Sequence, residues 1–215
     1  MMPVARDFFA RPAVEVAPDL LGAVIEHQTA AGLVAVRLTE VEAYAGESDP
    51  ASHAYRGKTR RTAVMFGPPG HAYVYFTYGM HFCVNLVCLP AGTAAAVLLR
   101  AGAVVEGEAL ARARRATSRS GADLASGPAR LCRALGIDSS LNGADVCAAD
   151  SPLRVRGVSR CRNTMARSAE MRIATGPRVG VTGAAEVPWR FWVEGAPSVS
   201  AYRPHARRQR KLVTR

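Results

Sequence analysis

Two stretches decide the fold: Ala23-Val-Ile-Glu-His-Gln28 and Leu33-Val-Ala-Val-Arg-Leu-Thr-Glu-Val-Glu-Ala-Tyr44. Both are rich in Val and other residues that favour strands, which predicts two β-strands. The residues between them, Ala30-Ala31-Gly32, predict a tight connection. The chain therefore starts its sheet early and carries a long second strand.

The rest of the chain predicts more strands than helices. Strands are expected at 71–78, 82–89, 95–101, 178–181 and 187–193, and helices at 11–21 and 104–115. A third helix is expected to open at Ser126-Gly127-Pro128, with Ser126 as its N-cap, and to stop at Gly136. Because tight turns link most strands, we predict an α+β fold with an antiparallel or mixed sheet.

Length and composition indicate one domain. The chain has 215 residues, of which 49% are hydrophobic, enough for a single core. We expect residues 1–202 to form that domain and the basic residues 203–215 to be a disordered tail. The odd count of five cysteines, without a C-x-x-C pair, argues against disulfides and against a zinc site.

The charge balance indicates the kind of partner. The net charge is +11, and Lys58 and Lys211 are the only lysines. Such an excess of arginine suggests a polyanionic partner such as nucleic acid. No apolar run is long enough for a membrane span and the first residues lack a secretory signal, so we expect a cytoplasmic protein without a membrane partner.

A carboxylate and an aromatic ring come together at the end of the second strand. If side chains alternate, Leu38, Glu40, Glu42 and Tyr44 share one face of that strand. Glu42 and Tyr44 then lie roughly 7 Å apart, just before a long loop at 45–62. This geometry places a possible base beside a flat ring, although a carboxylate near a strand end is more often simply solvated.

A second group of rings lies on the predicted strand 71–78. Tyr73 and Tyr75 share a face with Thr77, and Tyr78 ends the strand where Gly79 lets the backbone turn. Core packing is the common reason for aromatic residues in strands, but flat rings also stack on nucleic-acid bases. The loop before this strand carries the basic side chains expected to anchor DNA phosphates, which are Arg56, Lys58, Arg60 and Arg61.

These motifs, taken in order, resemble the alkyladenine (3-methyladenine or methylpurine) DNA glycosylase family. The likeness runs from about Phe8 to Ala201. The main matching motifs are Glu40-Val-Glu42-Ala-Tyr44, Ser52-His53, Met65-Phe66-Gly-Pro-Pro-Gly70, Tyr73-Val-Tyr75-Phe-Thr-Tyr78-Gly-Met80, Asn85, Leu98-Leu-Arg100, Gly127-Pro128-Ala-Arg130-Leu131 and Arg178-Val-Gly-Val181. The chain departs from the family where Thr62 follows Arg61, a position at which the family often has Asn.

The resemblance implies a fold and a reaction centre. The implied fold is a single mixed domain with a curved antiparallel β-sheet and flanking helices, similar to the barrel of the formyltransferase C-terminal domain, without metal or cofactor. Glu42 matches the carboxylate that activates water, and Arg100 matches the arginine that helps to hold that water. Tyr44 and Tyr75 match rings that enclose a flipped base, with His53 on the same pocket wall.

The resemblance also implies how DNA is engaged. Tyr78 matches the residue inserted into the duplex in place of the flipped nucleotide, and Met80 lies beside it. Asn85 matches the side chain that excludes the 2-amino group of normal guanine. The implied partner is double-stranded DNA containing damaged purines, bound by a monomer, in association with the nucleoid if the source is bacterial.

The expected activity is that of a monofunctional glycosylase of base excision repair. It would release alkylated or deaminated purines such as 3-methyladenine, 7-methylguanine, hypoxanthine and ethenoadenine. A lyase needs an amine for a Schiff base, and Lys58 and Lys211 lie in a loop and in the tail. Two alternatives stay open: a catalytically silent nucleic-acid-binding member of the fold, and an enzyme acting on an RNA base or a formyl-group acceptor.

Overall fold

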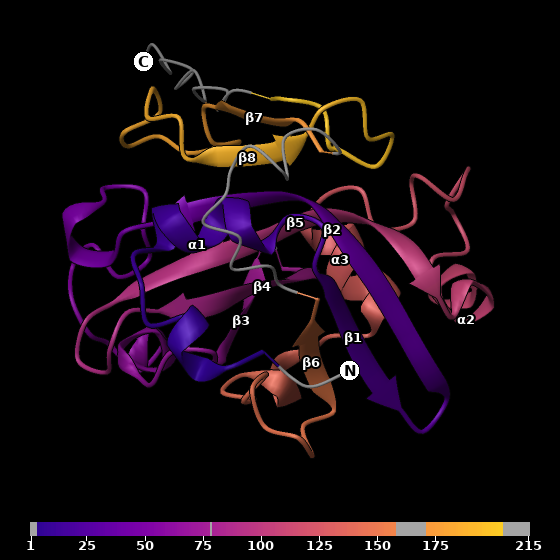
Figure 1. Cartoon of the computed structure of the whole chain (residues 1–215), viewed down its shortest axis with the longest axis horizontal. Coiled ribbons are helices and arrows are strands. Elements are labelled where there is room, and N and C mark those ends of the chain that lie inside the picture. The colour runs from indigo at the N-terminus through magenta and orange to yellow at the C-terminus, as the bar shows by residue number, and fades with distance from the viewer. Residues whose placement is uncertain (1–3, 78, 158–170, 204–215) are drawn as a thin grey trace, which may run out of the picture.

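Two long strands form the centre of the sheet in the computed structural model, which describes residues 4–77, 79–157 and 171–203 (Figure 1). Strand β2 spans Gly32–Tyr44 and strand β5 spans Ala95–Glu106. They run antiparallel to each other and share more contacts than any other pair of elements. Both are buried along most of their length, so their alternate side chains point either into the main core or toward the candidate site.

The other strands extend this pair into one curled antiparallel sheet, in the order β3-β4-β5-β2-β1-β6. Strand β1 pairs with the first half of β2, and β8 pairs with its second half, from Glu40 to Glu42. The remaining strands are β1 (Val24–Thr29), β3 (Ala72–Thr77), β4 (His81–Cys88), β6 (Leu153–Arg156), β7 (Ile173–Gly176) and β8 (Arg190–Val193). The predicted α+β fold with a curved antiparallel sheet is confirmed.

Three α-helices cover the sheet within the described residues: α1 (Ala13–Leu20), α2 (Glu108–Arg114) and α3 (Pro128–Leu135). Helix α1 packs on β2, and α3 packs on β4 and β5. Their apolar faces, including Leu20 and Leu131, are fully buried in the main core. Short 3-10 helices occur at Arg6–Phe8, Gly46–Ser48, Ala63–Phe66 and Ser139–Leu141.

Register shifts between β2 and β5 change which side chains share a face, and two of the three lie next to Glu40. Leu38 and Glu40 lie opposite consecutive residues of β5, so Thr39 is an extra residue on β2. The pairing then skips Arg100, which is the extra residue on β5. Such β-bulges redirect side chains and are common beside functional sites.

Because of the bulge at Thr39, the prediction of which side chains share a face of β2 was wrong. Leu38 points into the main core together with Val41 and Ala43, rather than lying with Glu40 and Glu42. Strict alternation failed because the extra residue reverses the orientation of every side chain that follows it. As a result the strand keeps an apolar face throughout and concentrates its two carboxylates on the other face.

Several predicted boundaries were also wrong. Strand β5 continues to Glu106, so the helix expected from residue 104 begins only at Glu108, after Gly107 turns the backbone at a φ of 72°. Ser126 does not cap α3, because it forms a β-bridge with Ala101 and the N-cap position is Gly127. The stop at Gly136 is confirmed by its left-handed φ of 74°.

The predicted strand at 178–181 is a loop. The strand before it, β7, was not predicted, and neither was β6. The closing strand β8 is confirmed but is shorter than predicted. In four-residue strands the alternation of apolar and polar side chains is too brief to give a distinct signal.

The loop that follows β2 depends on a glycine. Gly46 has a φ of 62°, and a Cβ atom added there would lie 1.8 Å from the carbonyl oxygen of Ala94. Only glycine permits this close approach of the two backbones. The loop is thereby held against the start of β5, where the candidate site begins.

Three further features of the described residues concern membrane helices, metal ligands and cysteines. No helix there has the length and hydropathy needed to cross a membrane. No group of three or more His, Cys, Asp or Glu side chains there could hold a metal ion. The four cysteines in these residues, Cys83, Cys88, Cys132 and Cys147, are unpaired.

Candidate active site

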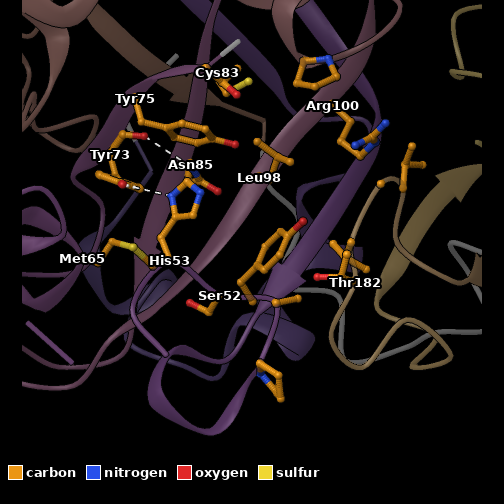
Figure 2. A pocket seen from close by; sticks show the side chains of 18 residues that line it. Ser52, His53, Met65, Tyr73, Tyr75, Cys83, Asn85, Leu98, Arg100 and Thr182 are labelled. Carbon is orange, nitrogen blue, oxygen red and sulfur yellow. Dashed lines mark hydrogen bonds between the residues drawn. The ribbon is translucent and has the colours of Figure 1, made fainter. Parts of the chain in front are cut away.

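A cavity of about 430 Å³ opens beside β2, β3, β4 and β5 (Figure 2). Its volume falls in the range of small-molecule sites. Figure 2 shows Tyr73, Tyr75 and His53 on one side of the cavity and Arg100 and Thr182 on the other. The full lining consists of Tyr44, Pro50, Ala51, Ser52, His53, Met65, Tyr73, Tyr75, Thr77, Cys83, Asn85, Leu98, Arg100, Pro128, Val179, Gly180, Val181 and Thr182.

One wall of the cavity is aromatic. Tyr73 and Tyr75 stack with ring centroids 5.5 Å apart, because they are alternate residues on one face of β3. The His53 ring meets Tyr75 edge-on at 4.5 Å, and its Nδ1 lies 3.1 Å from the Tyr73 hydroxyl. Partial desolvation beside these rings, aided by the charge of Arg61, lowers the pKa of His53 to about 4. The wall is therefore uncharged at neutral pH.

Tyr44 contributes a further ring, which is fixed from two directions. Its hydroxyl donates a hydrogen bond of 2.8 Å to Glu42 Oε2. The guanidinium of Arg178 lies 4.7 Å from its ring centroid and 5.2 Å from that of Trp189. Burial and the neighbouring Glu42 charge raise the pKa of Tyr44 well above its usual value, so this hydroxyl stays a hydrogen-bond donor.

Glu42 is the carboxylate closest to the cavity, and it is fully buried. Its Oε1 accepts a hydrogen bond of 2.7 Å from the backbone N–H of Val179 and lies 3.3 Å from Arg100 Nη1. Glu42 does not line the cavity itself; it lies behind Tyr44, Arg100 and Val179, which do. A carboxylate near a strand end is usually solvated, but Glu42 is buried and paired with Arg100.

The ion pair of Arg178 and Asp49 joins the segments around Tyr44. Both side chains are completely buried, and they meet through two hydrogen bonds, of 2.5 and 2.8 Å. Arg178 also donates to the carbonyl oxygen of Ala43, while Asp49 accepts from the backbone N–H groups of Ala45 and Ala51. This pair holds the end of β2, the loop at 45–54 and the loop after β7 together.

The structure places the other predicted pocket residue, Asn85, in the same cavity. Its side chain is buried, and its Nδ2 lies 3.5 Å from the carbonyl oxygen of Tyr73. Tyr44, His53, Tyr75, Asn85 and Arg100 therefore all line one cavity, and the roles predicted for them stay predictions.

The residues expected to contact DNA lie outside the cavity. Arg56, Lys58 and Arg60 are exposed, and the Arg61 guanidinium lies 5.8 Å from the Tyr75 ring, at the edge of the aromatic wall. Met80 follows β3 and is 69% exposed. Tyr78, the predicted inserted residue, lies outside the described residues, as does the predicted tail beyond residue 203.

Thr62, which departs from the family pattern, holds the loop in its own way. Its side chain is buried, and its Oγ1 accepts from the backbone N–H of Thr59 at 2.9 Å. It also hydrogen-bonds the Thr59 hydroxyl and the carbonyl oxygen of Gly57. Thr62 therefore holds the loop that carries the basic side chains through internal hydrogen bonds.

Sequence reasoning assigned no site role to several residues that the structure places here. Tyr73 could have been found, because it shares a face with Tyr75. Arg178 and Val179 were noticed only as part of a motif, since nothing local shows that they reach Glu42 or Tyr44. They lie more than 130 positions away along the chain and come close only through the fold.

Comparisons with known proteins identify the family of this chain. Residues 7–197 match the family model described as Methylpurine-DNA glycosylase (MPG). A Streptomyces avermitilis protein with the curated name "Putative 3-methyladenine DNA glycosylase" is 54% identical over 211 residues, covering 97% of this chain and 96% of the relative. Proteins of the same name from Leifsonia xyli and Methanocella arvoryzae are 52% and 47% identical, covering 93% and 94% of this chain and 92% and 98% of those proteins. The chain belongs to the methylpurine-DNA glycosylase family.

Proposed function

We propose that this protein is a monofunctional DNA glycosylase that extrudes a damaged purine from duplex DNA and hydrolyses its N-glycosidic bond. The observation that carries the proposal is the buried Glu42 directly behind a cavity walled by aromatic rings. An extruded base needs a flat, enclosed pocket, and its hydrolysis needs a carboxylate at the sugar. Family membership supplies the reaction class, a DNA N-glycosylase.

The proposed substrates are alkylated or deaminated purines. The rings of Tyr44 and Tyr75 both line the cavity, and aromatic rings can stack on an extruded base. A purine alkylated at N3 or N7 carries positive charge, and such a cation is attracted to aromatic faces. Because His53 is neutral there, it does not repel that charge. Asn85 lines the same cavity, where it would discriminate among purines by the groups on their rim.

Glu42 is proposed to act on a water molecule. An ionised carboxylate has about four acceptor positions. The Val179 N–H occupies one on Oε1 and the Tyr44 hydroxyl one on Oε2, while Arg100 Nη1 forms an ion pair at 3.3 Å from Oε1. The second position on Oε2 can accept a hydrogen bond from the attacking water. Arg100 and the Tyr44 hydroxyl hold the carboxylate in place.

The reaction then proceeds in one displacement at C1′. The water oxygen bonds to C1′ as the C1′–N9 bond breaks, and the bonding electron pair leaves with the purine. Glu42 accepts the proton of the water, and its negative charge stabilises the oxocarbenium-like sugar. An alkylated, cationic base leaves as a neutral molecule and needs no further proton.

The experiment is a base-release assay without added metal. Duplexes containing hypoxanthine, ethenoadenine or 7-methylguanine are incubated with the protein, and abasic sites are detected by alkaline cleavage. We expect release from at least one of these lesions and none from undamaged DNA. Binding to every lesion without release would instead identify a silent nucleic-acid-binding member of the family.

A further inference from the structure

A second carboxylate lies next to the proposed centre but does not line the cavity. Glu40 precedes Glu42 by two residues on the same face of β2 and is fully buried. Burying a carboxylate is costly unless it is paired. The contacts of Glu40 therefore indicate its role.

Glu40 holds one edge of the Arg100 guanidinium. Arg100 Nε donates to Glu40 Oε1 at 2.7 Å, whereas Arg100 Nη1 lies 3.3 Å from Glu42 Oε1. The contact with Glu40 is thus the shorter of the two. Arg100 lies at the β-bulge of β5, where the regular pairing with β2 is interrupted. Its orientation consequently depends on side-chain partners.

Three further hydrogen bonds hold Glu40 itself in place. Arg190 Nε donates to its Oε1 at 2.8 Å, the Ser200 backbone N–H donates to its Oε2 at 2.7 Å, and the Ser200 hydroxyl donates to its Oε1 at 2.9 Å. Ser200 Oγ also accepts from Arg100 Nη2 at 3.2 Å. The Arg100 guanidinium is therefore held by Glu40 and Ser200 in addition to its contact with Glu42.

The charges of this cluster balance. Glu40 and Glu42 carry two negative charges, and Arg100 and Arg190 carry two positive ones. Burial raises the pKa of Glu40, but the charges of Arg100 and Arg190 and the amide of Ser200 outweigh this, and its pKa lies below the usual value. Glu40 is thus a permanent anion that shares Arg100 with Glu42.

We propose that Glu40 is a positioning residue for base excision: it holds the Arg100 guanidinium at the angle in which it faces both Glu42 and the cavity. This role rests on the proposed function. Without Glu40 the nearest anion to Arg100 is Glu42, so the guanidinium would turn toward Glu42 and toward the proposed water position. Glu40 itself touches neither the cavity nor the substrate.

The test compares two isosteric variants, Glu40→Gln and Glu26→Gln. Glu26 is a matched control, because it is buried on β1 and paired with two arginines, Arg154 and Arg156, away from the cavity. Single-turnover release of 7-methylguanine is measured with each variant, together with affinity for the lesion duplex. We expect a rate on the order of tenfold to a hundredfold lower for Glu40→Gln, at similar affinity, and a near-normal rate for Glu26→Gln.

The pH–rate profile separates positioning from simple structural support. A cationic base leaves without protonation, so the acid limb of its profile reports the carboxylate that activates water. Because Glu40→Gln removes one anion from the buried cluster, we expect this limb to move to lower pH. The charged and titratable groups that face Glu42 besides Glu40 are Arg100, Tyr44, Tyr75, Cys83 and Arg178.

Each outcome is decisive. An unchanged rate and pH profile in Glu40→Gln would overturn the positioning role while leaving the proposed function intact. A wild-type protein that releases no base would overturn both. If Glu40→Gln does not fold, Ser200→Ala decides, since it removes a hydroxyl and no charge. Ser200→Ala should excise several-fold more slowly with an unshifted profile, and a wild-type rate would contradict the proposal.

Discussion

At the scale of single residues, His53 is the side chain whose protonation can be tested most directly. Its pKa of about 4 lies below the ordinary 6.5, mainly because of burial and secondarily because of Arg61. The folded state therefore binds this proton less readily than the unfolded state. The resulting contribution to stability is complete above pH 6.5 and declines as the pH falls toward 4.

A titration followed by NMR checks this prediction. The His53 ring signals should remain those of a neutral imidazole down to about pH 5 and change only below that. His53→Gln serves to assign the signals. A midpoint near 6.5 would mean that the ring is solvated and that the aromatic wall carries charge under mildly acidic conditions.

The sequence located most residues of the site but not their contacts. Tyr44, His53, Tyr75, Asn85 and Arg100 line one cavity, because the motifs that carry them lie on adjacent strands and the loop between them; their roles stay predictions. That Glu42 lies behind Tyr44 and Arg100 was not predictable, since it depends on a bulge and on Val179, far along the chain.

At the scale of elements, the buried pair of Arg178 and Asp49 holds the loops to the end of β2. Replacing Asp49 with Ala leaves Arg178 buried without its carboxylate, and such a loss costs about 3–5 kcal/mol. Urea denaturation should show this decrease in the free energy of unfolding.

The matched control for this prediction is an exposed ion pair. Glu108 and Arg112 meet at 2.7 Å on α2, where both side chains are about half exposed. Glu108→Ala should cost less than about 1 kcal/mol. Equal effects of the two substitutions would show that the pair of Arg178 and Asp49 does not hold these loops.

The elements themselves were predicted unevenly, for physical reasons. Strand β2 shows alternation over much of its length and β5 begins with a continuous apolar run, so the presence of both was predicted, although β5 extends past its predicted end at Ala101. The short strands β6 and β7 carry too few residues for alternation to be recognised. The face of Leu38 was wrong because an extra residue in a strand leaves no mark in the pattern of residue types.

At the scale of the whole molecule, the net charge of +11 predicts binding to DNA that weakens with salt. The basic loop lies at the end of the sheet opposite α2 (Figure 1). Replacing both Arg56 and Arg60 with Ala should reduce the slope of log affinity against log salt by about 2, since each phosphate contact contributes roughly 0.9.

A second double variant controls for the loss of charge alone. Arg112 and Arg119 are also exposed, on and after α2. Replacing both with Ala removes the same charge and should leave the slope nearly unchanged. Similar slopes for the two double variants would mean that the basic loop does not contact phosphates.

The central claim is that Glu42, buried behind the aromatic cavity, carries out the hydrolysis. Single-turnover release of hypoxanthine and binding to the same duplex, measured for the wild type and for Glu42→Gln, test it most directly. We expect the variant to bind lesion DNA about as tightly as the wild type and to release the base at least about a hundredfold more slowly. Release by Glu42→Gln at the wild-type rate would show that Glu42 does not carry out the hydrolysis.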